Sequence, residues 1–418
     1  MSRPEKIISI IMLFLSGALF AQETKLKIFT DCQTGCYLTY LKQNLQGVEF
    51  VRDRHDADVY ILITSEANGS GGETYYVDFE GQGKFKNVKE QLIFNTNPDM
   101  QAEEIRTKLL KVIRLGLAKF WLHAGADDIF DIQFHQTAQT VKPPEDKWNN
   151  WVFRMSVSGF GNGDSNFSSV NYNTGFSARQ VKKEHKFKFS LHYSHGKQKY
   201  VFGDYIIRSK KESFSTHISE ILSINEHWSY GFFGGAYRSS YSNYRFAGYF
   251  NAGVEYDFFP YSQSSKHLLA LQFKIGPQRN IYFEKTIFGQ TMETLWQSQV
   301  SLVTDIVRKW GNINLSLNYD QYLGKPELRS FSFYSGIQLR LYKGLNFRVS
   351  GSYAITHDKI NIAAGGASLE EILLRQKELL SSYNFFASVG LSYSFGSIYN
   401  TIVNPRFGGG GSRVYYFY

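Results

Sequence analysis

The sequence predicts an all-β transmembrane antiparallel barrel of about twelve strands, preceded by a small N-terminal α/β domain. Of the 418 residues, 35 are Phe, 28 are Tyr and 36 are Gly, so aromatic residues reach 17%. The mean hydropathy is nevertheless only −0.31, which does not fit a helical membrane protein. From residue 148 onward, apolar and polar residues alternate in one run after another. A barrel explains both features, because its strands present an apolar face to lipid and a polar face to the interior.

Residues 1–21 have the three parts of a secretory signal peptide. Arg3 and Lys6 give a positive start, residues 7–20 form an apolar core, and Ala21 is a small residue at the expected cleavage point. The alternative is a retained anchor helix, but the apolar run is shorter than the roughly 20 residues that span a bilayer. No later run is long and apolar enough to span as a helix. Membrane insertion therefore requires a closed barrel, in which every backbone polar group is paired.

The chain has two cysteines, Cys32 and Cys36. An exported chain enters an oxidising compartment, so we expect a local disulfide between them. Their spacing is one residue longer than that of thioredoxin-like redox motifs, and no second pair of metal ligands accompanies them. We therefore expect neither redox catalysis nor a zinc site.

Residues 22–135 alternate between strand and helix patterns. Strands are predicted at "KLKIFTD", "VEFVRD", "ADVYILITSEA", "ETYYVDFEGQG" and "EQLIFNT". A helix is predicted at "CYLTYLKQNLQ", and a longer amphipathic helix runs from Ile105 to Trp121, its start marked by Asn97-Pro98-Asp99. The polar, proline-containing residues 136–147 form a predicted linker.

This order of elements resembles the N-terminal domain of TolB. The resemblance rests on the strand–helix–strand start, the "ADVYILI" strand, the hairpin into "YYVDF" and the closing helix. It implies a periplasmic module that contacts a protein or peptide and is not an enzyme. Residues 25–135 would then bind a periplasmic protein partner.

Residues 148–395 contain the alternating runs of the predicted barrel. Clear examples are "WVFRMSVSG" (151–159), "KFKFSLHYS" (186–194), "NINLSLNYD" (312–320) and "YNFFASVGLSYSFGS" (383–397). Tight connections at 182–185, 224–227, 262–266, 309–311 and 342–344 alternate with longer ones at 195–212, 276–292 and 357–382. This alternation is typical of bacterial outer-membrane barrels. A soluble sandwich or lipocalin-like barrel is the alternative, but it gives no reason for the alternation.

The last strand ends in Leu391, Tyr393 and Phe395, the position of the assembly signal in outer-membrane barrels. The following tail, residues 396–418, contains Pro405 and four consecutive glycines, so we expect it to remain in the periplasm without forming a strand. Three segments, "EHWSYGFFGGAY", "AAGGASLEEILLRQKELLSSYNFF" and "YSFGSIYNTIVNPRF", resemble an uncharacterised outer-membrane β-barrel family common in Bacteroidota. This resemblance implies location and architecture, but no substrate.

Charged residues occupy the predicted inward positions of the strands. They are Arg154, Arg179, Lys186, Lys188, Glu255, Asp257, Lys274, Asp305, Asp320, Arg340 and Arg348. They predict either a charged pore that selects solutes or a lumen filled by mutually paired charges. The loop 357–382 holds a capping box, Ser368 to Glu371, which indicates a helix that serves as a lid or packs on the surface.

The sequence gives no sign of catalysis. His192, His217, His227, His267 and His357 are scattered, no Ser–His motif is present, and the glycine-rich runs lack the context of a phosphate loop. We expect no cofactor, no metal and, despite the net charge of +9, no nucleic acid, because no binding motif accompanies the charge.

Two functions follow from the expected architecture. The first is an outer-membrane barrel, surrounded by outer-membrane lipid, that anchors a periplasmic protein-binding module in an envelope-biogenesis or structural role. The alternative is a porin-like channel or transporter for a small polar solute. Either protein would lie in the outer membrane of a Gram-negative bacterium, with the N-terminal domain in the periplasm.

Overall fold

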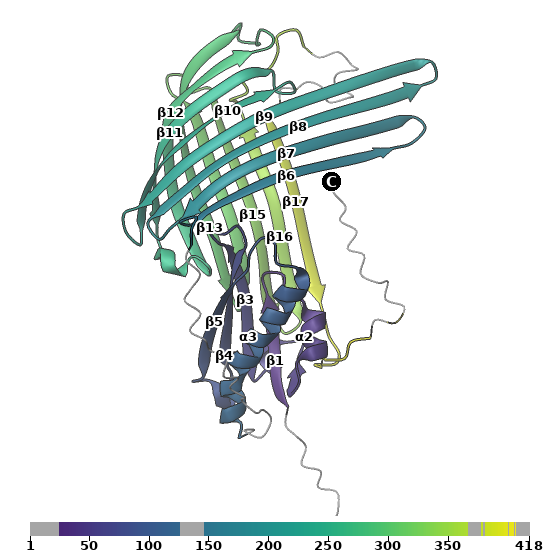
Figure 1. Ribbon diagram of the computed structural model, residues 1–418, viewed down its shortest axis with the longest axis vertical. Helices are drawn as coiled ribbons and strands as arrows, with labels where there is room; N and C mark the ends of the chain where they lie inside the picture. Colours follow the sequence, from purple (N-terminus) through teal and green to yellow (C-terminus); the bar gives the residue numbers. More distant parts are fainter. Residues whose placement is uncertain are drawn as a thin grey trace, which may run out of the picture.

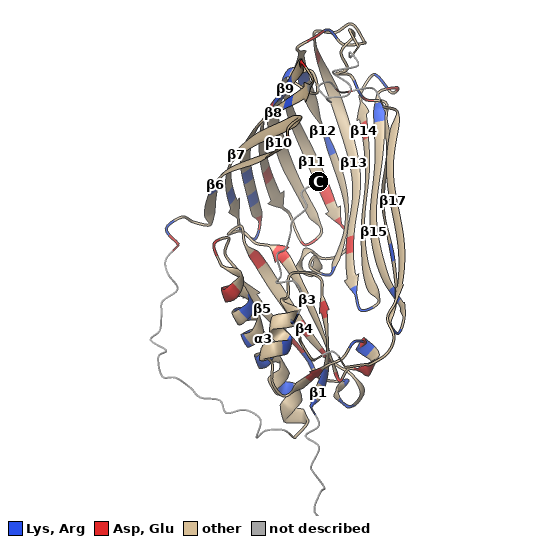
Figure 2. Cartoon of the chain, turned by 90° about the vertical axis from the view of Figure 1, so that its right-hand side faces the viewer, with Lys and Arg blue, Asp and Glu red and all other residues tan. Residues whose placement is uncertain are grey.

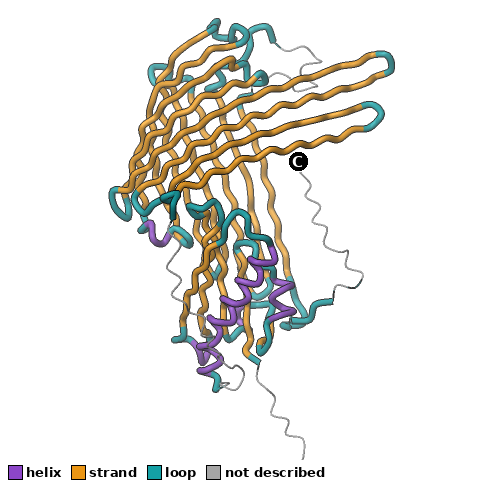
Figure 3. Tube along the Cα trace, viewed as in Figure 1, coloured by secondary structure: helices purple, strands orange, loops and turns teal. Residues whose placement is uncertain are grey.

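The computed structural model describes residues 25–125, 146–366, 378, 381–399, 401–404 and 406, which form two sheets. The predicted signal peptide, most of the linker, the capping box of Ser368 and Glu371, and the glycine run of the tail lie outside these residues. Among these residues, helices are confined to the part of the chain that forms the smaller sheet, apart from a short turn at Tyr261–Gln263 (Figure 3).

The smaller sheet has five strands in the order β2-β1-β3-β4-β5. The elements follow one another as β1 (Leu26–Cys32), α2 (Leu38–Asn44), β2 (Val48–Phe50), β3 (Val59–Ala67), β4 (Glu73–Gly81), β5 (Lys89–Asn95) and α3 (Ala102–His123). Strand β1 pairs in parallel with β2 and β3, whereas β3–β4 and β4–β5 are antiparallel. Short 3-10 turns occur at Arg54–Asp56 and Gly83–Phe85. The predicted α/β domain, called here the small domain, is confirmed.

Helices α2 and α3 cover one face of the small sheet and enclose its core. Leu41, Leu109 and Phe120 are fully buried against Ile61 and Phe79 of the strands. The stripe predicted for α3 is confirmed, but its start is not at Asn97-Pro98-Asp99. Gln101 is the N-cap and forms a capping box with Glu104, because these two side chains satisfy the first free amides of the helix.

The larger sheet consists of twelve antiparallel strands in sequence order. They are β6 (Trp151–Gly163), β7 (Phe167–Val181), β8 (His185–Phe202), β9 (Tyr205–Ser223), β10 (Trp228–Ser239), β11 (Tyr244–Asp257), β12 (His267–Tyr282), β13 (Met292–Arg308), β14 (Gly311–Tyr322), β15 (Arg329–Tyr342), β16 (Leu345–Thr356) and β17 (Tyr383–Tyr393). The predicted number of strands is confirmed. The sheet curves strongly, and β6 and β17 are its two end strands (Figures 1 and 2).

Among the described residues, no helix combines the length and the hydrophobicity needed to cross a membrane.

The predicted long connection at 195–212 is wrong. Strands β8 and β9 continue through it in unbroken register to a turn at Gly203 and Asp204, where Gly203 has a φ of +59°. The segment is polar, but cross-strand pairing extends well past the 9–11 residues that a membrane strand needs. The hairpins β6–β7 and β8–β9 therefore extend well away from the rest of the sheet (Figure 1).

The pairing register gives the large sheet two different faces. One face, called here the apolar face, carries on every strand a large apolar side chain that is more than one-third exposed. Examples, one for each strand, are Met155, Tyr172, Tyr193, Ile218, Phe232, Phe250, Phe273, Val300, Tyr319, Phe331, Tyr353 and Phe385. The opposite face, called the polar face, carries small and charged residues.

Candidate functional site

The register places all eleven predicted inward charges on the polar face. Cross-strand pairs such as Arg179–Lys188, Gln338–Arg348 and Gln299–Asp320 link neighbouring strands on this face. No two of the eleven charges form an ion pair with each other in the described part of the chain. Of the eleven, Arg340 alone has an ion-pair partner among the described residues, and that partner belongs to the small domain.

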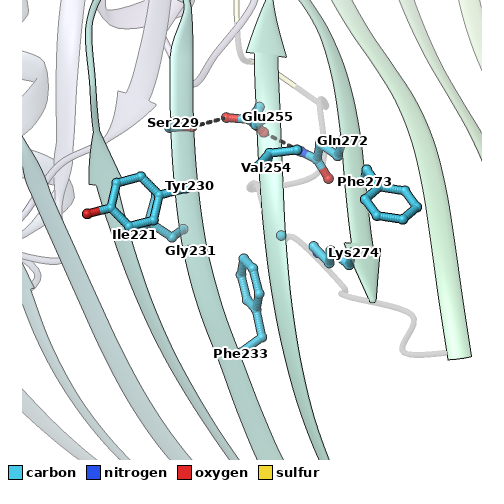
Figure 4. Close-up of a pocket in the computed structure, with 11 residues that line it drawn as sticks. Ile221, Ser229, Tyr230, Gly231, Phe233, Val254, Glu255, Gln272, Phe273 and Lys274 are labelled. Atoms are coloured by element: carbon cyan, nitrogen blue, oxygen red, sulfur yellow. Dashed lines mark hydrogen bonds between the residues drawn. The ribbon is translucent and has the colours of Figure 1, made fainter. Parts of the chain in front are cut away.

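A small pocket on this face lies between β9, β10, β11 and β12 (Figure 4). Its volume is about 180 Å³. The Glu255 carboxylate accepts hydrogen bonds from Gln272 Nε2 at 2.5 Å and from Ser229 Oγ at 3.3 Å. The Lys274 ammonium lies 4.5 Å from the centre of the Phe233 ring. Neutral donors and an aromatic ring thus stabilise these two opposite charges separately.

Aromatic side chains gather at the end of the apolar face where β7–β8, β9–β10, β11–β12, β13–β14 and β15–β16 turn, called here the short-turn end. Ring contacts occur between Trp151 and Phe187, between Trp228 and Tyr256, and between Tyr393 and Phe395. The predicted assembly-signal residues Leu391, Tyr393 and Phe395 are all exposed here, at 67%, 59% and 77%. Such amphipathic rings are favoured where one end of a side chain meets water and the other an apolar phase.

The small domain docks on the short-turn end through the face of its sheet that lies opposite the helices (Figure 1). Among the described residues, four ion pairs cross the contact, each joining a carboxylate of the small domain to a cation at or close to a turn of the large sheet. The pairs are Asp31–Arg340, Asp56–Lys343, Asp78–Lys266 at 2.7 Å, and Glu80–Lys309. Asn312 Nδ2 also donates to Gln33 Oε1 at 2.7 Å, and Ser264 Oγ donates to Glu66 Oε1 at 3.1 Å.

The centre of this interface is the pair between Asp31 and Arg340. Asp31 is 2% exposed, and the guanidinium donates to both of its carboxylate oxygens, with Nη2 to Oδ1 at 2.6 Å. The buried Tyr60 hydroxyl donates to the same carboxylate. Burial, followed by the charge of Asp31, raises the pKa of Tyr60, so this hydroxyl stays protonated as a donor.

A second contact involves the loop after β2. Asp53 Oδ2 accepts a hydrogen bond from the Gly344 amide at 2.9 Å. Burial raises the pKa of Asp53, but hydrogen bonds from the His55 amide, the His55 ring and the Gly344 amide together lower it below its usual value. Beside this loop, Val51 bridges Tyr399, and the Arg52 amide donates to the Ile398 carbonyl at 2.7 Å. The start of the C-terminal tail is therefore bound along the small domain.

Sequence reasoning identified only Arg340 among the eight charges of these ion pairs, and it assigned Arg340 to a lumen. The sequence does contain two hints of this interface. Asp78 and Glu80 alternate with buried residues in β4, so they lie on the face of the small sheet away from its core. Lys266, Lys309 and Lys343 all lie at tight turns of the large sheet. What the sequence lacked was the distance between these groups.

The structure joins Cys32 and Cys36 by a disulfide between the end of β1 and the segment before α2. Cys36 is buried in the core of the small domain. In the described ranges, no group of three or more His, Cys, Asp or Glu side chains is arranged to hold a metal ion.

Comparison with protein families gives one match. The family described as "Protein of unknown function, DUF481" matches residues 159–327. This range runs from β6 to the segment before β15 and so covers most of the large sheet. The comparison with curated proteins gave no match.

Proposed function

We propose that the chain is an integral outer-membrane β-barrel that holds a periplasmic module at its short-turn end and presents that module to a periplasmic protein partner. The role of such an assembly would be structural or in envelope biogenesis. The observation that carries the proposal is the exposed apolar face, which continues over all twelve strands. Monomeric soluble proteins rarely expose an apolar patch larger than a few hundred Å².

Two further features support this proposal. Aromatic rings gather at the short-turn end of the apolar face, where a membrane interface would lie. The four ion pairs hold the small domain at the same end, which would be the periplasmic end. The resemblances to an outer-membrane barrel family of Bacteroidota and to the N-terminal domain of TolB agree with this orientation. Closure of the barrel, by pairing of β6 with β17, is part of the proposal.

Membrane location is tested by fractionation and by electrophoresis with and without heating. A folded barrel should sediment with outer membranes, require detergent for release, and migrate differently before and after boiling. Recovery of the full chain in the detergent-free soluble fraction would refute the membrane proposal.

Presentation to a partner is tested by site-specific photo-crosslinking in intact cells. Leu115 on α3 is 59% exposed and lies on the side of the small domain away from the large sheet. A crosslinker at this position should capture a protein. The matched position is Phe331 on the apolar face, which is 37% exposed and should contact lipid only. Equal capture from both positions, or none from Leu115, would argue against a presented module.

A channel is the second candidate, and the polar face favours it in one respect. Among the described residues, ten of the eleven predicted inward charges form no ion pair, Arg340 being the exception, so these ten remain available to a solute. Planar-bilayer recording separates the candidates. Anchoring predicts no stable conductance from the purified chain, whereas a steady, charge-selective current would favour transport.

A further inference from the structure

A cavity of about 570 Å³ lies where three parts of the chain meet at the short-turn end. The small domain contributes the loop after β2, the large sheet contributes the β15–β16 turn with the adjoining polar face, and β17 contributes its last residues. The lining residues include Arg52, Arg54, Arg340, Lys343 and Arg348. The docked arrangement of the two sheets thus creates a cavity that neither sheet encloses alone.

The charges of the lining do not balance. Five cationic side chains face one carboxylate, that of Asp53. Arg340 and Lys343 are neutralised by Asp31 and Asp56 in the interface ion pairs.

Three arginines remain, Arg52, Arg54 and Arg348, and none of them forms an ion pair with any described residue. With the lining residue His55 counted as neutral, three positive charges against Asp53 leave a formal excess of two.

The hydrogen-bonding capacity of these arginines is also largely unused. The Arg52 Nε is buried and has no hydrogen-bond partner in the described structure. Among the described residues, the side-chain partner of Arg52 is the Gly396 carbonyl, 3.3 Å from Nη2, and that of Arg348 is Gln338 Oε1, 3.5 Å from Nη2. Ser392, Ser394 and Asn346 add neutral donors to the wall. A buried guanidinium donor without a partner is costly, so this cavity is set up to receive an acceptor.

We infer that this cavity binds a phosphate-bearing anion through Arg52, Arg54 and Arg348. Guanidinium forks match phosphate oxygens with paired hydrogen bonds, and a phosphomonoester carries close to two negative charges at neutral pH. That charge equals the excess in the cavity. A single carboxylate ligand carries one negative charge and would leave one positive charge of this excess unmatched. The cavity has room for a group larger than phosphate itself.

The test uses the full-length chain in detergent and titration calorimetry with inorganic phosphate, pyrophosphate and acetate. We expect saturable binding of both phosphate probes and weaker binding of acetate. Arg54→Gln and Arg348→Gln should each weaken binding about ten- to a hundredfold, because each removes charged hydrogen bonds. The matched control is Arg154→Gln, which removes a charge from the same polar face but outside the cavity and should leave affinity unchanged.

A separate arm identifies the source of the phosphate. The chain is placed in lipid nanodiscs with or without phosphatidic acid, and retained lipid is measured by native mass spectrometry. Retention that is lost in Arg54→Gln but not in Arg154→Gln assigns the site to a lipid headgroup, whereas binding of free phosphate alone assigns it to a soluble solute.

Hydrogen exchange of the Gly344 amide verifies docking in each variant. One cavity variant lies in the small domain and the other in the large sheet, so loss of docking in one leaves the other informative. The inference is overturned if no phosphate probe binds saturably, or if Arg154→Gln weakens binding as much as the cavity variants. It does not depend on membrane location, because the calorimetry is done in detergent.

Discussion

Replacing Arg340 by Ala is expected to release the small domain from the large sheet. The substitution leaves Asp31 without its cation, and this carboxylate is 2% exposed while the domain is docked. Removing one partner of a buried ion pair costs about 3–5 kcal/mol. In the undocked state Asp31 is hydrated, so the unpaired charge destabilises only the docked state. The substitution therefore shifts the docking equilibrium toward the undocked state.

Hydrogen exchange of the Gly344 amide measures that equilibrium directly. This amide donates to Asp53 across the interface at 2.9 Å, so the bond exists only when the domain is docked. Each step of about 1.4 kcal/mol changes the docking equilibrium constant tenfold. A loss of about 3–5 kcal/mol should therefore speed exchange of this amide by roughly two to nearly four powers of ten. Amides at the centre of β15 serve as the internal reference, because their ladder does not depend on docking.

Two variants separate the paired contact from a general charge effect. Arg340→Lys keeps the charge but loses the two-pronged hydrogen bond, and should give an intermediate rate. Arg308→Ala removes an exposed arginine at the same end of the sheet that makes no ion pair to the described residues, and should stay within about 0.5 kcal/mol of the parent. Equal acceleration by Arg340→Ala and Arg308→Ala would refute the reasoning.

Three further predictions concern the small domain. Thiol labelling of the unreduced protein should detect no free cysteine at Cys32 or Cys36, and two labelled thiols would contradict the disulfide. Burial, and then the charge of a neighbouring carboxylate, raises the pKa of Tyr75 to about 12. Because the pKa of Tyr75 is higher in the folded than in the unfolded chain, the protonated tyrosine stabilises the fold. This stabilisation is complete below pH about 10 and is lost as the pH rises toward 12. Tyr75→Phe should flatten that alkaline loss in a pH series of thermal unfolding, and an unchanged profile would exclude Tyr75 as its source. Gly116→Ala would place a Cβ 2.1 Å from the Phe79 ring, so it should destabilise the domain by about 1–3 kcal/mol in denaturant unfolding. A gain of about 1 kcal/mol, as expected for an unobstructed helix position, would show that the helix can shift.

Local patterns were sufficient to predict most elements of both sheets. Alternation with a period of two indicated the strands from Trp151 to Tyr393, because one residue in two faces the apolar side of a sheet. The helical stripe of α3 was equally clear. At 195–212 the polar composition predicts a loop, but pairing between β8 and β9 keeps the segment extended. The N-cap at Gln101 was missed because stronger helix-start residues lie just before it.

The candidate sites were much less accessible to sequence reasoning. Arg340 was recognised as a charge on the polar side, but its partner Asp31 lies 309 positions away in the chain. Arg52 and Arg54 carried no signal, since isolated arginines in a loop have no periodicity. The same holds for the tail, where Tyr399 bridges Val51 across the small domain.

The sequence by itself determined most of the secondary structure and the faces of most elements, because these depend largely on side chains one to four positions apart. Only the tertiary structure decided which charges meet, since the ion pairs between Asp31 and Arg340 and between Glu80 and Lys309 depend on how the two sheets pack against each other. Coulombic attraction acts through space and leaves no periodic trace along the chain. For this reason the interface and its arginine-lined cavity became visible only in three dimensions.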